Sequence, residues 1–318
     1  MIVLCNFSEE SCFLLDCGEG TYGQIVRFYG KEGTDNVMKK LKMIYVSHLH
    51  ADHHLGLIDL LQRRRTLTDE KVVLIAPIQI NTWLNFYNNR ITEIESTYEL
   101  VPNGDLLSCF NDDKTFDSIK RKLGLVEIET CYVKHCPNAF GLSFKIPNKM
   151  ICERFPLEVI KITYSGDCLP SKELAKLGEY SDLLIHEATM EDALSDEAKI
   201  KMHSTISEAI AVGREMNAQY TMLTHFSQRY AKIPLMDSES CPNVGIAFDN
   251  MEVTLNDLPV LHLMYEPLKL MFNDHFQQME QKAVKRKFQL DRKIEKSLPN
   301  ENQKKKILRL SDDEKRTI

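Results

Sequence analysis

A segment at residues 45–57, "YVSHLHADHHLGL", contains four of the ten histidines of this chain. These histidines and one aspartate fall within seven consecutive positions, at His48, His50, Asp52, His53 and His54. Imidazole nitrogens and carboxylate oxygens are ligands that zinc takes in proteins. The segment directly follows an apolar run, so we predict a metal site at the end of a buried strand.

The spacing divides these residues between two ions. His48 and His50 are two apart on an extended segment, so their side chains point the same way and can bind one ion. Asp52 and His53 lie where a helix begins, and we expect them to face a second ion. His54 projects about 100° away from His53 on that helix, so we expect it around the site or on the surface.

Other apolar runs also end in residues that bind metals. The residues at these predicted strand ends are His135, Asp167, His186, Glu187 and His225. Strand ends at one edge of a sheet are where α/β proteins build sites. Asp167 can bridge two cations with its two oxygens. Two metals about 3.5–4 Å apart can stabilise the attacking and leaving oxygens of a phosphoryl displacement. A ligand set without thiolate indicates zinc, with manganese or iron as substitutes.

The elements that must position these residues alternate between strand and helix patterns. Strands are predicted at 12–16, 41–48, 72–77, 126–135, 139–146, 158–167, 182–189 and 219–225. Helices are predicted at 21–30, 55–65, 78–90, 171–180 and 204–217. Residues 92–124 are polar and irregular, and we interpret them as an insertion with one short helix near "FDSIKRKL". The pattern is mixed α/β, with sheets covered by helices.

Composition and charge narrow the class of protein. A hydrophobic content of 43% and 27% charged residues are typical of a soluble globular protein. The nine cysteines form no CxxC pair, and no export signal is apparent, which predicts reduced thiols in an intracellular compartment. No apolar run approaches the length that spans a bilayer, so no membrane partner is expected.

The carboxyl-terminal residues differ in charge from the rest of the chain. Residues 274–318 contain 13 Lys+Arg and 8 Asp+Glu, a local charge of +5. Because the whole chain has a net charge of −6, the other residues together carry −11. We therefore predict a catalytic domain at 1–273 and a charged helical or disordered tail at 274–318. This tail is interpreted as solvated.

We also interpret Arg63, Arg64 and Arg65 as a solvated helix end and not as a clamp for RNA.

The chain resembles a known family in several motifs. "HLHADH" at 48–53 resembles the HxHxDH signature of the metallo-β-lactamase superfamily. "HEAT" at 186–189, "HST" at 203–205 and "HFSQRY" at 225–230 are similar to tRNase Z, the ELAC-type zinc phosphodiesterase that removes the 3′ trailer from precursor tRNA. The resemblance runs from about Phe13 to Leu268 and is to the carboxyl-terminal catalytic half of the long eukaryotic form. It implies an αββα sandwich, two zinc ions and zinc-dependent endoribonuclease activity.

The resemblance also implies a role for each ligand. The residues for the first zinc ion are His48, His50 and His135, and those for the second are Asp52, His53 and His225, with Asp167 as the bridge. It further implies that Asp16 is a buried carboxylate that supports the histidine segment. Cys168 stands where threonine is usual, and because it points opposite to Asp167 in extended backbone, we do not expect it to be a ligand.

Catalytic groups are predicted around this ligand set. Asp52 is expected to accept or orient the proton of the attacking water. His203 is expected to donate a proton to the leaving 3′-oxygen; it precedes a capping-box pattern and therefore lies at a helix amino terminus. That position lowers an imidazole pKa, so a carboxylate partner is needed to restore it. Glu187 is the candidate partner, or else a buried carboxylate that only supports the site.

Two more residues have weaker predicted roles. His186 is expected beside the ligands without binding a metal, and Arg229 is either a phosphate contact or a surface residue.

Several alternatives remain open at this stage. The metal motif also suits a small phosphodiester or thioester hydrolase. The family carries a further strand and a tRNA-binding loop ahead of Asp16 and a degenerate amino-terminal half, which we expect this chain to lack. A truncated form with little or no activity is therefore an alternative. We expect precursor tRNA as the partner, a monomer or a pairing with the missing half, and a location in the nucleus, the mitochondrion or both.

Overall fold

The computed structural model describes most of the chain. Its described residues are 3–8, 11–107, 113–148, 158–227, 235–236, 241–274, 276–278, 280–282, 284–285, 288 and 292. The chain divides into two compact units, one formed by Met1–Arg229 with Met236–Pro267 and the other by Tyr230–Leu235 with Leu268–Ile318. All the described site residues belong to the first unit. The domain boundary after residue 273 remains a prediction.

The first unit contains two β-sheets. One sheet has the strand order β1 (Val3–Ser8), β2 (Ser11–Leu15), β3 (Leu41–Tyr45), β4 (Val72–Ala76) and β5 (Tyr98–Pro102). Its β1 and β2 are antiparallel, and the remaining pairs are parallel. The other has the order β11 (Val244–Ile246), β10 (Tyr220–Thr224), β9 (Leu183–Glu187), β8 (Val159–Tyr164), β7 (Phe140–Pro147) and β6 (Glu127–Tyr132).

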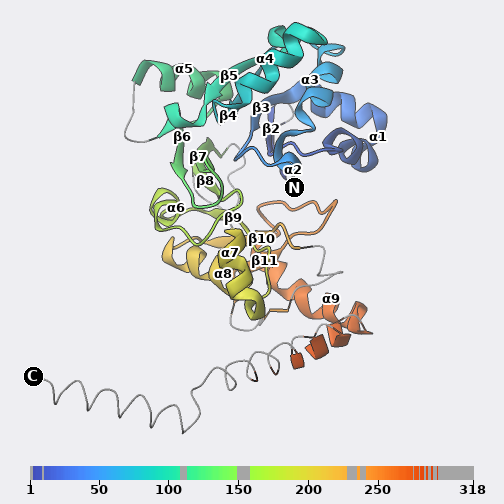
Figure 1. The fold of residues 1–318 in the computed structure, drawn as a ribbon, viewed down its shortest axis with the longest axis vertical. Helices are drawn as coiled ribbons and strands as arrows, with labels where there is room; N and C mark the ends of the chain where they lie inside the picture. The colour runs from blue at the N-terminus through green and yellow to red at the C-terminus, as the bar shows by residue number, and fades with distance from the viewer. Residues whose placement is uncertain are drawn as a thin grey trace, which may run out of the picture. The chain divides into compact units, whose positions relative to one another are not determined.

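Helices connect most of these strands. The α-helices are α1 (Thr21–Lys40), α2 (Ala51–His54), α3 (Leu57–Arg65), α4 (Ile80–Arg90), α5 (Asp113–Leu123), α6 (Lys172–Leu177), α7 (Ser195–Lys201), α8 (Ile206–Glu215) and α9 (Tyr265–Met271). Short 3-10 helices are η1 (Glu95–Thr97), η2 (Asn103–Leu106), η4 (Asp192–Leu194) and η5 (Leu258–Met264). Figure 1 shows α1, α3 and α4 beside the first sheet.

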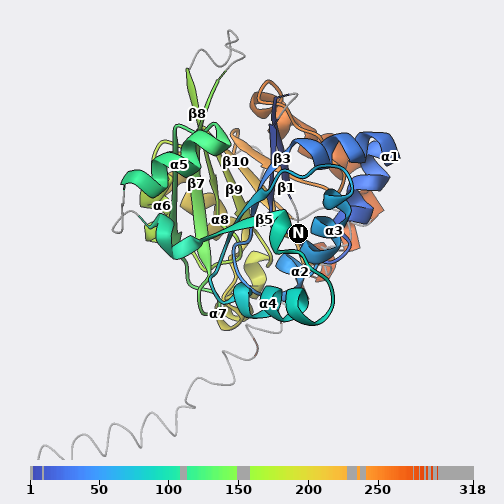
Figure 2. The ribbon, with the colours of Figure 1, turned by 90° about the horizontal axis from the view of Figure 1, so that it is seen from above.

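The main core lies between the two sheets. The Phe13 ring of β2 meets that of Phe144 of β7 edge to face at 6.0 Å, and the Tyr45 ring of β3 meets that of Tyr164 of β8 at 6.2 Å. Separate clusters of buried apolar residues pack the helices onto the outer sheet faces. Figure 2 shows both sheets between α1 and α3 on one side and α6 on the other. This is the predicted αββα sandwich, and the burial of apolar strand faces against helices stabilises it.

The structure departs from the sequence analysis in several elements. One strand, β1, precedes β2 and pairs with it. The interpretation of residues 92–124 as an irregular insertion was wrong for β5, which pairs in parallel with β4 and buries Tyr98 and Val101. Within α1, Gly30 has φ 68° and ψ 179°, so the helix is interrupted where the sequence predicted its end.

The interpretation of the three arginines at the end of α3 as solvated is confirmed for two of them and wrong for the third. Arg63 and Arg65 have half-exposed side chains, as predicted for a solvated helix end. Arg64 is only 2% exposed, and its guanidinium donates to the backbone carbonyls of Met38 and Glu70. It therefore ties α1 to the segment before β4, because a buried guanidinium needs such acceptors.

Strand direction brings the predicted site residues of the second sheet to one edge. β8, β9 and β10 are mutually parallel, and β6 runs in the same direction because two antiparallel pairings separate it from β8. The carboxyl ends of these strands therefore meet at the same edge of the sheet.

Candidate metal centre

The seven predicted metal ligands lie together: three of them follow strands at this edge of the second sheet, and the other four lie on the segment after β3 of the first sheet. Their donor atoms form groups in which every atom lies within 4.8 Å of the others. The groups are His48, His50, His135 and Cys136; His48, His53 and Asp167; Asp52, His53 and His225; His135, Asp167 and His203; and Glu187, His203 and His225. The first and third groups contain the two predicted ligand sets.

Asp167 lies between these two sets. Its Oδ2 is 3.9 Å from Nε2 of His48 and 3.9 Å from Nε2 of His135 in the first set. The same atom is 3.2 Å from Nε2 of His53 and 3.5 Å from Nε2 of His225 in the second. One carboxylate thus faces both sets, which is the placement that a bridging ligand requires.

The donor atoms suit a metal ion. The buried Nε2 atoms of His48 and His53 and Oδ1 of Asp167 have no hydrogen-bond partner among the described residues. Buried polar atoms are normally paired, and an unpaired group in a native structure calls for an explanation such as a bound ion. His135 Nε2 also lies only 3.0 Å from His50 Nδ1, so a proton or a cation must lie between these two lone pairs.

Local charge likewise favours a cation. Burial lowers the pKa of His53, but Asp16, Asp167 and Asp52 outweigh it and raise that pKa to about 12. A positive charge is therefore strongly stabilised at this position, whether a proton or a metal ion carries it. Burial and the charge of His53 lower the pKa of His48 to about 3, so its imidazole is neutral and its lone pair can bind a metal.

Asp16 supports the histidine segment through hydrogen bonds. It is fully buried and accepts hydrogen bonds from Ser47 N (2.7 Å), Ser47 Oγ (2.9 Å), His53 Nδ1 (2.8 Å) and the Tyr164 hydroxyl (2.5 Å). Asp16 and His225 both adopt φ 60°, in the left-handed region that aspartate, asparagine and histidine enter more readily than most other residues with a side chain.

His203 and Glu187 form a pair beside the ligands. His203 Nδ1 is 2.8 Å from Oε1 of Glu187, which is fully buried and also accepts from the backbone N–H of Cys168. Burial lowers the pKa of His203, but the hydrogen bond and charge of Glu187 outweigh it, so this pKa lies above its ordinary value. The predicted capping box is present, since Thr205 and Glu208 bond reciprocally at the start of α8.

The remaining predicted residues have different surroundings. His186 is buried on the other face of β9, where its Nε2 lies 3.9 Å from Cys168 Sγ, because side chains alternate along a strand. It makes no hydrogen bond to a predicted ligand among the described residues. Arg229 lies outside the described residues. His54 packs its ring edge to face on Trp83 at 5.1 Å and belongs to none of the ligand groups.

Four residues at the site were not found from the sequence. Thr189 Oγ1 donates to Oε2 of Glu187 at 2.6 Å and lies 2.7 Å from His225 Nδ1. Met202 offers its carbonyl to His135 Nδ1 at 2.8 Å. Ser47 and Tyr164 hold Asp16. Such outer partners fix the tautomer of a ligating histidine, but hydroxyls and carbonyls give no signal in a single sequence.

Cys136 is a further neighbour of the first set. Its thiol belongs to the group of His48, His50 and His135. Burial raises the pKa of this thiol, and His48, His50, His135 and Asp167 already offer the four donors that a zinc ion usually takes. We therefore leave it out of the proposed ligand set.

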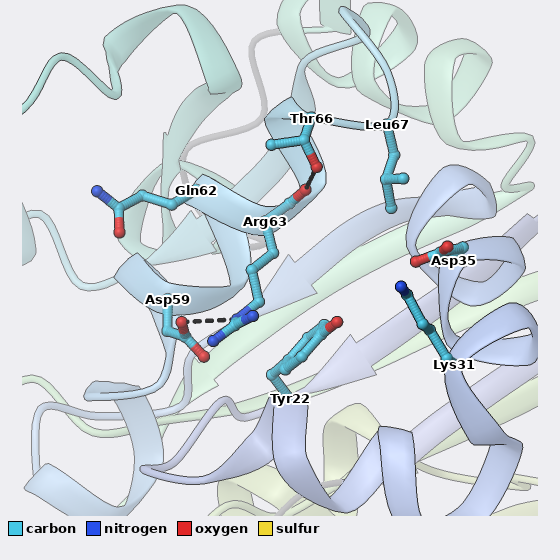
Figure 3. Close-up of a pocket in the computed structure, with 8 residues that line it drawn as sticks. All are labelled: Tyr22, Lys31, Asp35, Asp59, Gln62, Arg63, Thr66 and Leu67. Carbon is cyan, nitrogen blue, oxygen red and sulfur yellow. Dashed lines mark hydrogen bonds and ion pairs between the residues drawn. The ribbon is translucent and has the colours of Figure 1, made fainter.

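A separate hollow of about 450 Å³ lies between α1 and α3. Figure 3 shows Arg63 between Asp59 and Tyr22: its Nε donates to Asp59 Oδ1 at 2.8 Å, and its guanidinium lies 4.2 Å from the Tyr22 ring centroid. Lys31 and Asp35 add one charge of each sign. No member of the ligand groups lines this hollow, so it is not part of the metal centre.

Glycine at position 18 allows the histidine segment to pack closely on the loop after β2. A Cβ on Gly18 would lie 2.1 Å from the carbonyl oxygen of Asp52. Gly18→Ala should therefore displace Asp52 and His53, lower the free energy of unfolding by about 1–3 kcal/mol and reduce bound metal.

The matched control is Gly23→Ala in α1, where a Cβ would meet nothing within 4 Å. This variant should be neutral or gain up to about 1 kcal/mol, because alanine favours helix over glycine. Denaturant unfolding and metal analysis of both variants check the prediction. Equal metal content and stability in the two variants would contradict it.

Comparison with known proteins decides the family. A family model described as the anti-Pycsar protein Apyc1 matches residues 2–240. The chain belongs to this family.

No helix among the residues that the structure describes is long and apolar enough to cross a membrane.

Curated relatives carry ribonuclease names. "Ribonuclease Z, mitochondrial" of Drosophila melanogaster is 50% identical over 294 residues, which cover 92% of this chain and 37% of the relative. "Zinc phosphodiesterase ELAC protein 2" of Macaca fascicularis is 42% identical over 287 residues, which cover 87% of this chain and 33% of the relative. The chain thus spans about a third of the length of these relatives.

Solved structures agree with the fold. A long form RNase Z from yeast has a TM-score of 0.74 at 29% identity, covering 84% of this chain and 40% of that one. The metallo-β-lactamase fold protein YhfI from Bacillus subtilis has a TM-score of 0.51 at 15% identity, covering 77% of this chain and 87% of that one, and shows the fold alone. The predicted resemblance to tRNase Z is confirmed, and so is the predicted metallo-β-lactamase fold.

Proposed function

We propose that this chain is a zinc-dependent endoribonuclease that removes the 3′ trailer from precursor tRNA. The observation that supports this most directly is the placement of Asp167 between two sets of histidine and aspartate donors. The names of the relatives, ribonuclease Z and zinc phosphodiesterase, favour a phosphodiester substrate over a thioester.

The proposed ligand sets fit two zinc ions, since imidazole and carboxylate are ligands that zinc takes. His48, His50 and His135 would hold one ion, and Asp52, His53 and His225 the other, with Asp167 shared. When bound, a pair of zinc ions supplies Lewis acidity at the phosphoryl oxygens and lowers the pKa of a water molecule.

The residues of the chain supply the proton transfers and the orientation. Asp52 has a 63% exposed side chain beside His53 and His225, whose imidazoles lower its pKa. We infer that its carboxylate accepts or orients the proton of the attacking water. Glu187 holds Nδ1 of His203, which leaves Nε2 to donate a proton to the 3′-oxygen that departs from phosphorus.

The partner and the location belong to the same proposal. Precursor tRNA is the proposed substrate, and the mitochondrion is the proposed location, supported by the printed name of the Drosophila melanogaster relative. A nuclear location, and a monomer or a pairing with an amino-terminal half, stay predictions.

The test uses this chain with zinc on three substrates: precursor tRNA, bis(p-nitrophenyl) phosphate and a thioester. We expect trailer removal, hydrolysis of the small phosphodiester and no action on the thioester. Activity on the thioester with none on RNA would overturn the proposal.

The same experiment separates binding from chemistry. Residues 1–273 carry a charge of −11, although the net charge of the whole chain is −6. Positive side chains that neutralise phosphates supply most sequence-independent affinity for nucleic acid, so a negatively charged domain binds RNA weakly. We therefore expect a higher KM for precursor tRNA than that of a full-length long relative, with a smaller difference on the small phosphodiester. Equal efficiency on precursor tRNA would contradict this expectation.

A further inference from the structure

Tyr164 connects the second sheet to the carboxylate that supports the ligands. It is the last residue of β8, three positions before Asp167, and its ring is fully buried. Its hydroxyl donates to Oδ2 of Asp16, which follows β2 of the first sheet, at 2.5 Å. A hydrogen bond from a neutral hydroxyl to a buried carboxylate is a strong, charge-assisted one.

Asp16 in turn fixes a histidine in each ligand set. His53 Nδ1 lies 2.8 Å from Asp16 Oδ2, so it donates its proton there and keeps Nε2 for a metal. Ser47 Oγ donates to the same oxygen at 2.9 Å and lies 3.0 Å from His48 Nδ1. Because the Ser47 proton is used for Asp16, its oxygen accepts the N–H of His48.

Both histidines thus present an unpartnered Nε2 to the site among the described residues. The direction of each ring depends on the position of one carboxylate. Three donors share its Oδ2, and Tyr164 is the one that comes from the opposite sheet.

We propose that Tyr164 is a positioning residue for both ligand sets: its hydroxyl holds Asp16 so that His48 and His53 direct Nε2 at the metal ions. This inference rests on the proposed function, which makes the two histidines ligands. Without the hydroxyl, the Asp16 carboxylate can turn, and both imidazoles lose part of their fixed orientation. Loss of such an outer partner typically lowers metal affinity by about 10- to 100-fold.

The experiment compares the zinc affinity of the wild type, Tyr164→Phe and Tyr45→Phe by competition with a chelator. Tyr45 is a matched control because it is also fully buried, meets the Tyr164 ring at 6.2 Å and donates its hydroxyl elsewhere, to the carbonyl of Phe140 at 2.8 Å. Thermal unfolding of the metal-free proteins is measured in parallel. We expect zinc affinity to fall by about 10- to 100-fold in Y164F alone, with similar metal-free melting temperatures for the two variants.

Each contrary result overturns the inference. Wild-type zinc affinity in Y164F would show that the hydroxyl does not position the ligands. An equal loss of affinity in Y164F and Y45F would show a general effect of core hydroxyls. A Y164F chain that does not fold would show a folding residue instead. A wild type that binds no zinc would refute the proposed function as well, whereas the other results leave that function intact.

Discussion

Replacing Asp167 by alanine should release both metal ions and abolish hydrolysis while the chain stays folded. The carboxylate lies within 4.0 Å of Nε2 of His48 and His135 in one set and of His53 and His225 in the other. Its removal therefore takes the shared anionic ligand from both sets, and it leaves only imidazoles in the first set and Asp52 as the one carboxylate of the second. Metal analysis and hydrolysis of precursor tRNA and bis(p-nitrophenyl) phosphate measure the effect.

Two further variants separate charge from structure. Asp167→Asn keeps the shape and one oxygen but removes the charge, so we expect it to lose metal as well, to a smaller extent. Asp182→Asn removes the charge of another buried carboxylate, one that accepts from the backbone of Lys161. This control should keep both ions. Two zinc ions still bound to the D167A variant would show that Asp167 is not the shared ligand.

The sequence predicted the ligand-bearing elements because their signals are local. His48 and His50 follow a continuous apolar strand, and Asp167 and His225 follow two others. Buried parallel strands are near-continuous apolar runs, so the positions where they end can be read directly. Parallel pairing brings the ends of β8 and β10 to one edge of the second sheet, and the packing of the two sheets places the end of β3 beside them.

Elements with weaker patterns were missed. β5 is a five-residue edge strand in which only Tyr98 and Val101 are buried, and β11 has three residues. Runs of three to five residues are too short to show a clear periodic pattern in the sequence. The prediction that Arg64 is solvated was also wrong. Its acceptors, the carbonyls of Met38 and Glu70, come close to it only through the packing of the fold, which the sequence pattern does not show.

The support of the ligands was also invisible in the sequence. Contacts from Tyr164 to Asp16 span 148 positions, and those from His135 to Met202 span 67. Neither a tyrosine in a strand nor a backbone carbonyl differs from its many structural counterparts. Only the fold shows which hydroxyl or carbonyl faces a ligand.

Replacing His203 by alanine should slow hydrolysis by about 10²- to 10⁴-fold with both metal ions retained, the range for loss of a general acid. The imidazole lies beside the ligand sets, and its Nδ1 is bonded to buried Glu187 at 2.8 Å, so Nε2 is the atom that can reach a leaving oxygen. Single-turnover kinetics at saturating RNA measure the chemical step, and metal analysis follows the ions.

His54→Ala is the matched control, because it removes an imidazole that packs on Trp83 outside every ligand group. It should retain both ions and most of the rate. The contrast matters because Nδ1 of His203 also lies 4.0 Å from Oδ2 of Asp167, close enough for a place among the ligands. Loss of zinc from H203A, with zinc kept in H54A, would make His203 a ligand and would assign proton donation to another group. Retained zinc with a slowed chemical step places the proton on His203, because the ions alone then fail to expel the 3′-oxygen at the normal rate.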